Sequence, residues 1–169
     1  EIEARVELAL AALDLGHLEE AATQARTARQ LEGDGSSEGL MPVLLAIEAR
    51  ACWAQGAIDE AVELARAAVG LNRSGALLAH LAAWWSAEVL EAAGDQDVAS
   101  REVALAYQLL TRHLADLPEA VARAAWEQVA EHRAILDARE RFFEEQIEVR
   151  LPVAEAPGGR PLENEDLIT

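Results

Sequence analysis

The segment Leu15-Gly16-His17-Leu18-Glu19-Glu20-Ala21 decides the fold, because its pattern recurs twice further along the chain. The later copies are Gln55-Gly56-Ala57-Ile58-Asp59-Glu60-Ala61 and Ala93-Gly94-Asp95-Gln96-Asp97-Val98-Ala99. Their glycines fall 40 and then 38 residues apart, and an alanine stands five residues after each glycine. A glycine that ends one helix, followed by acids in the first turn of the next, is typical of a tight turn between helices. The pattern therefore predicts three helical hairpins.

The second helix of each hairpin repeats one packing face. Small or apolar residues recur on it at helical spacing, which lets the two helices of a hairpin approach closely. The three sets are Ala21, Ala25, Ala28 and Leu31, then Ala61, Ala65, Ala68 and Leu71, then Ala99, Val103, Ala106 and Leu109. A hairpin is unstable alone, so each is expected to bury its face on the next.

The expected helix boundaries follow from these turns. Helix pairs are predicted at 2–15 with 18–31, at 40–55 with 58–70 and at 76–93 with 97–115, which gives repeats at 1–31, 40–71 and 76–115. The Gly- and Ser-rich stretch 32–39 reads as a flexible connector. Pro118 marks a new helix start, and a last pair within 118–146 is expected to be a degenerate repeat or a cap.

The chain resembles tetratricopeptide repeats, in the helix-ending glycine and the alanine that opens the second helix. Leu8, Ala9 and Ala12 stand where that motif has its leucine, small residue and aromatic. The motif's opening tryptophan and closing proline are replaced, and the period exceeds the usual 34 residues. The replacing residues are Arg5, Leu45 and Ala83, then Gly33, Arg73 and Thr111.

This long-period, alanine-rich variant resembles the arrays of large bacterial signal-transduction regulators, including ATPase-linked transcriptional activators of the maltose-regulator type. The resemblance implies an all-α domain over 1–146, built of antiparallel helix hairpins stacked as a right-handed α-solenoid.

From Ile147 the apolar period changes to two, through Val149, Leu151 and Val153. We therefore predict that 147–169 is an extended tail or the start of a following domain.

Composition restricts the classes of partner. The net charge is −17, with 31 acidic residues against 14 basic ones, so nucleic acid and anionic membranes would be repelled. The single cysteine, Cys52, precludes an internal disulfide and suits the reducing cytoplasm. No signal peptide or membrane-length apolar run is visible, and we expect the chain to be a piece cut from a longer protein.

We find no catalytic, cofactor or metal motif in the sequence. The histidines His17, His80, His113 and His132 are scattered along it, without a His-Glu-x-x-His face. Cys52 has no visible histidine partner, and no Gly-x-Ser-x-Gly elbow occurs. Paired acids such as Glu19-Glu20 are expected to lie on solvent-exposed helix faces. We therefore expect no enzyme, no cofactor and no metal.

In a stack of tetratricopeptide repeats, the first helix of each pair would line a concave groove. Trp and Arg in that register favour a partner-binding role, while the alternative is that Trp53 and Trp84 fill the core. The predicted partner-binding residues are Leu10, Leu13, Arg50, Trp53, Leu81, Trp84, Glu88 and Glu91.

The leading interpretation is a non-catalytic scaffold for a protein or peptide segment, possibly a neighbouring domain of the same chain, inside a larger bacterial signalling or transcriptional regulator. Two alternatives stay open. One is a homo-oligomerisation module, and the other is the regulatory domain of an enzyme whose catalytic part lies elsewhere.

Overall fold

A computed structural model describes residues 1–32, 39–72, 76 and 78–150. Every regular element within these residues is an α-helix, so the all-α prediction is confirmed for the described part of the chain. The helices are α1 (Ile2–Asp14), α2 (Leu18–Glu32), α3 (Met41–Ala54), α4 (Ile58–Leu71), α5 (Ala79–Ala92), α6 (Gln96–Ala115), α7 (Glu119–Gln128) and α8 (Ala130–Arg150). These bounds lie within a few residues of the predicted ones except at the end of α8.

The three predicted glycine turns share one hydrogen-bonding pattern. Gly16, Gly56 and Gly94 have φ of 74°, 83° and 89°, a left-handed conformation that glycine adopts without a Cβ clash. Each glycine N–H donates to the carbonyl three residues earlier. The next N–H donates five residues back, at 2.8, 2.9 and 2.8 Å in the three turns. This pair of bonds satisfies carbonyls left open by the ending helix, and it explains why the sequence repeats here.

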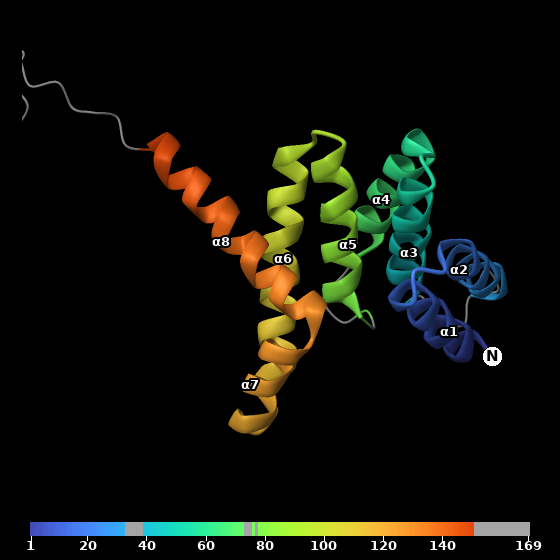
Figure 1. Cartoon of the computed structure of the whole chain (residues 1–169), viewed down its shortest axis with the longest axis horizontal. Coiled ribbons are helices and arrows are strands. Elements are labelled where there is room, and N and C mark those ends of the chain that lie inside the picture. The colour runs from blue at the N-terminus through green and yellow to red at the C-terminus, as the bar shows by residue number, and fades with distance from the viewer. Residues whose placement is uncertain (33–38, 73–75, 77, 151–169) are drawn as a thin grey trace, which may run out of the picture.

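The helices pack in the predicted pairs. Helix α1 lies against α2, α3 against α4, α5 against α6, and α7 against α8. Between pairs, α2 packs on α3, both α3 and α4 pack on α5, and α6 packs on α8. Figure 1 shows the pairs following one another in chain order, from α1–α2 at one end to α7–α8 at the other.

The core combines small and large buried side chains, and on α2 and α4 the buried hydrophobic residues are all alanines. All the predicted alanines of the second-helix faces are fully buried, which permits close helix approach. Leu44 and Ile47 on α3 and Leu90 on α5 supply the volume that alanines lack. The predicted faces are too long at one end, because Leu31 and Leu71 lie exposed at the last turns of α2 and α4.

The prediction that the chain is extended from Ile147 onward is wrong at the start of that segment. Residues 147–150 continue α8, which ends at Arg150. Helix formation is costly to begin and favourable to extend, so the helix-forming run through Gln146 carries the alternating Ile147 and Val149 with it. The remainder of the predicted tail, 151–169, and most of the predicted connector, 33–38, lie outside the described residues.

Candidate partner-binding surface

Two of the predicted binding residues come together between α3 and α5. The Arg50 guanidinium Nε lies 3.7 Å from the Glu88 carboxylate, and each side chain is about one-third exposed. The same guanidinium sits 5.6 Å from the ring centroid of Trp85, within cation–π distance. Trp85 was not among the predicted residues, because its position next to Trp84 turns it to a different side of the helix.

The tryptophans divide between core and surface. Trp84 is only 6% exposed, so this ring fills the core, as the alternative interpretation of the sequence expected. Trp85 is buried as well. Trp53 is partly exposed and packs one side against the core. Arg50 and Trp53 are three residues apart on α3, which places them on one helix face. Of the two predicted tryptophans, only Trp53 offers area to a partner.

The other predicted residues lie on two helices, α1 and α5. Leu81 on α5 and Leu10 and Leu13 on α1 are partly buried against the core. Glu91 on α5 is bonded by Arg141 of α8, whose guanidinium reaches both carboxylate oxygens. The α3–α5 surface, as we use the term below, comprises Arg50, Trp53, Leu81, Glu88 and Glu91.

The electrostatics of this surface centre on Glu88. Burial raises the pKa of its carboxyl, and Glu131 and Glu91 act in the same direction, whereas Arg50 opposes them. Glu88 Oε2 and the indole Nε1 of Trp85 are buried without a hydrogen-bond partner in the described part of the chain. Glu88 Oε2 keeps its 3.7 Å ion-pair contact with Arg50, whereas Trp85 Nε1 is a buried donor without a partner among these residues, which is unfavourable.

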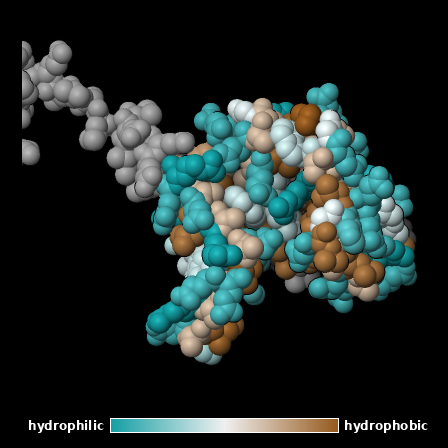
Figure 2. Space-filling view, viewed as in Figure 1, coloured by the Kyte–Doolittle hydropathy of each residue, from teal (hydrophilic) through white to brown (hydrophobic). Residues whose placement is uncertain are grey.

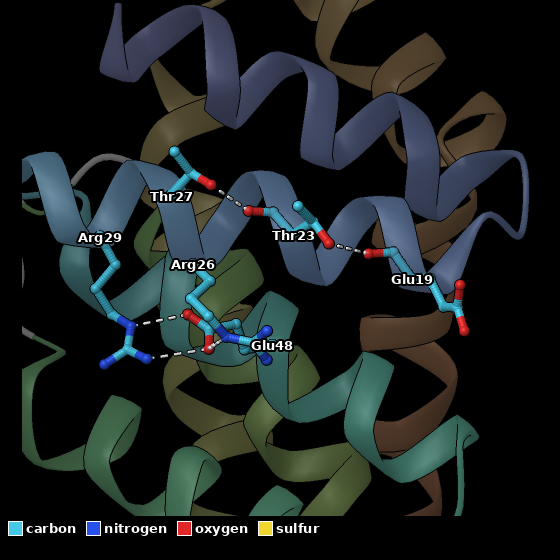
Figure 3. A network of polar contacts seen from close by, with 6 residues as sticks. All are labelled: Glu19, Thr23, Arg26, Thr27, Arg29 and Glu48. Carbon is cyan, nitrogen blue, oxygen red and sulfur yellow. Dashed lines mark hydrogen bonds and ion pairs between the residues drawn. The ribbon is translucent and has the colours of Figure 1, made fainter.

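A second charged contact joins α2 to α3. Glu48 is buried, and its carboxylate accepts hydrogen bonds from Arg29 Nε at 2.8 Å and Arg29 Nη2 at 3.1 Å. Arg26 Nε lies 3.6 Å away, and Figure 3 shows both arginines of α2 reaching toward this carboxylate. Glu48 stands where the other hairpins have Leu8 and Ser86. This ion pair was not predicted from the sequence, and the signal that could have indicated it is an acid inside an apolar run.

Three of the four histidines, although scattered in sequence, meet in space. His80 on α5 stacks on His113 of α6 and meets His132 of α8 edge-on, and His132 also contacts the Trp126 ring. Burial, His132 and His113 together lower the pKa of His80 to about 4. Burial also lowers the pKa of His132, although its hydrogen bond with the Ala125 carbonyl and the nearby Glu131 oppose the shift. We call these three residues the histidine cluster.

The described residues include the one cysteine of the chain, Cys52, which is buried. Burial and the nearby Glu60 raise the pKa of the Cys52 thiol, which disfavours the nucleophilic thiolate. No group of three His, Cys, Asp or Glu side chains there has the geometry to hold a metal ion. The same residues include no helix that is both long enough and apolar enough to cross a membrane.

Comparisons with family models, with curated proteins and with solved structures found no match to this chain.

Proposed function

We propose that the chain is a non-catalytic scaffold of the tetratricopeptide type whose α3–α5 surface holds a protein segment. Its hairpins would form successive steps of a right-handed α-solenoid. In support, three hairpins share one turn geometry, and each later hairpin packs on the one before it. We further propose that it works in the cytoplasm, inside a larger bacterial signalling or transcriptional regulator.

The observation that carries the proposal is the pairing of Arg50 with Glu88 beside the partly exposed Trp53. An exposed indole supplies apolar contact area, and an Arg–Glu pair can orient a polar chain. The Glu88 carboxylate, about one-third exposed, offers an acceptor to amide or ammonium donors, and the acidic chain favours basic partners. We therefore propose a Gln- and Lys-rich segment as the ligand.

The test is an NMR titration of the whole chain with two synthetic peptides of equal length, one of Gln and Lys residues and one with Glu in place of Lys. We expect the first to shift the Trp53 indole and the Arg50 and Glu88 resonances, and the second to shift none. Trp53→Ala and Glu88→Gln should weaken binding, whereas Trp126→Ala on α7 serves as the control.

Absence of binding by the Gln- and Lys-rich peptide, or binding that survives both surface substitutions, would refute the proposal. The homo-oligomer alternative gives a different result. Light scattering would then show a stable dimer of the unmodified chain that Trp53→Ala dissociates.

A further inference from the structure

The α7–α8 pair buries less of itself against the molecule than the earlier hairpins do. Helix α7 has no fully buried residue over Glu119–Gln128, whereas α5 buries most of its residues. Among the described side chains of α8, only Ile135, Ala138 and Phe142 are buried. Figure 2 shows a projection from the body of the molecule at the place where Figure 1 draws α7. Elements that bury little apolar area open at a lower free energy than the core does, so this pair is the candidate for separate opening.

Several aromatic rings meet across the boundary between this pair and the earlier hairpins. His132 of α8 lies 5.7 Å from His80 of α5, measured between ring centroids. Trp126 of α7 lies 5.8 Å from Tyr107 of α6 in the same measure. The chain crosses the boundary at Pro118, whose missing N–H interrupts the helical hydrogen bonding after α6. Movement of α7 and α8 as one body therefore requires a change at this connection and separation of these rings.

His132 belongs to the α7–α8 pair rather than to the hairpins. Its Nδ1 lies 3.1 Å from the Ala125 carbonyl oxygen of α7, and its ring meets that of Trp126 on the same helix. His80 stacks on His113, so these two rings remain together on α5 and α6. The boundary therefore divides the histidine cluster between His80 and His132. Undocking of the pair removes His132 from one side of His80 and opens that side to water.

Protonation of these rings acts against the docked arrangement. The groups that face His80 are His113 of α6 and His132 of α8, and both are positively charged when protonated. Together with burial they lower the pKa of His80. Burial and His113 also lower the pKa of His132, whereas the Ala125 carbonyl and Glu131 raise it. A base whose pKa is lowered by docking takes up its proton more readily once undocked, so acid favours the undocked pair.

We propose that the histidine cluster is a proton-sensitive switch whose protonation shifts α7 and α8, as one unit, toward an undocked arrangement while α1–α6 stay folded. Undocking also withdraws Arg141 from the Glu91 carboxylate, both oxygens of which its guanidinium holds in the docked pair. Glu91 belongs to the α3–α5 surface, so undocking frees one of the charges of that surface. The proposal concerns the docking itself and does not depend on what the α3–α5 surface binds.

Native-state amide exchange of the whole chain tests whether the pair opens separately. We expect the amides of α7 and α8 to share one opening that is favoured about tenfold or more over the opening of α3 and that depends less on added urea. Ile47→Val weakens the core at α3 and should speed exchange there, while exchange in α7 and α8 stays unchanged. Exchange of α8 that follows α3 both in urea dependence and in the Ile47→Val variant would overturn the proposal.

The same measurement at pH 7.5 and 5.5, corrected for the intrinsic exchange rate, tests the role of the histidines. We expect the opening of α7 and α8 to become about tenfold more favourable at the lower pH. This factor follows from a pKa of His80 that changes from about 4 in the docked pair toward 6.5 in water.

Variants on both sides of the boundary separate the histidines from other titrating groups. His80→Gln should lose most of the pH response, and His132→Gln should reduce it as well. His17→Gln, in the α1–α2 turn, should keep the response in full. An opening of α7 and α8 that does not respond to pH, or a response that both cluster variants retain, would overturn the proposal.

Discussion

The imidazole of His80 on α5 stacks on that of His113 on α6, with ring centroids 5.9 Å apart and an interplanar angle of 14°. His132 on α8 completes the cluster at 5.7 Å from His80. The helices α5, α6 and α8 thus meet at three imidazole rings, which carry no charge when unprotonated. Protonation of His80 would place a positive charge in a partly buried site, which burial and the two neighbouring imidazoles disfavour.

We therefore predict that acidification destabilises the fold through His80. Its pKa falls from 6.5 to about 4 on folding, so between these values the unfolded chain binds the additional proton. The stabilisation is complete above pH 6.5 and is lost as the pH falls toward 4. It amounts to about 2 kcal/mol after allowance for partial exposure. Urea unfolding between pH 4 and 7.5 measures it.

Matched variants separate this effect from carboxylate titration. His80→Gln should flatten the pH dependence relative to the unmodified chain, whereas His17→Gln should not. His17 is an exposed residue in the α1–α2 turn, 3.8 Å from Glu20. Identical pH profiles for the His80→Gln variant and the unmodified chain would contradict the prediction.

The contact between α2 and α3 gives a second prediction. Arg29 makes two hydrogen bonds to Glu48, whereas Arg26 approaches the same carboxylate only to 3.6 Å. Arg29→Ala leaves a buried carboxylate without its bidentate partner and should cost about 3 kcal/mol. Arg26→Ala removes a half-exposed, longer contact and should cost about 1 kcal/mol or less. Denaturant unfolding of both variants checks the order, and equal losses would refute it.

The hairpins could be predicted from sequence because their signals are local. Each turn needs a left-handed residue at one position, and Gly16, Gly56 and Gly94 mark it directly. The alanines that follow, on the second helix of each hairpin, indicate the close approach of two neighbouring helices. In contrast, the alternation through Ile147 and Val149 was misleading, because helix propagation from the preceding residues outweighed the local period.

The candidate site could be predicted only in part. Arg50 and Glu88 occupy equivalent positions in the repeat, on α3 and α5. The predicted groove-facing register includes both residues, and their side chains contact each other. The burial of Trp84 depends on how closely α5 meets its neighbours, which no local pattern reports. The histidine cluster joins residues of α5, α6 and α8, and its formation depends on the docking of α8, which has no counterpart in the repeat.

The turn glycines allow a stability test with an internal control. Gly56 has φ of 83°, and a Cβ added there meets no atom within 4 Å, so the cost of Gly56→Ala is purely one of backbone conformation. We expect a loss of about 1–2 kcal/mol. Gly70 lies inside α4 with equally open space around it. Gly70→Ala should therefore stabilise the protein by about 0.5–1 kcal/mol. Thermal unfolding distinguishes the opposite signs, and an unchanged or raised stability of Gly56→Ala would contradict the left-handed turn at Gly56.

The last prediction compares Trp53 with Trp84, which separates binding from packing. Trp84→Ala creates a cavity in the core between α5 and its neighbours and should cost about 3–5 kcal/mol. Trp53 keeps part of its surface in solvent, so Trp53→Ala should cost about 1–2 kcal/mol. Thermal melts give both values. A loss at Trp53 as large as that at Trp84 would mean that both rings are structural, and the α3–α5 surface would then present no aromatic contact to a partner. A small loss at Trp53, combined with loss of peptide binding, would assign this ring to recognition.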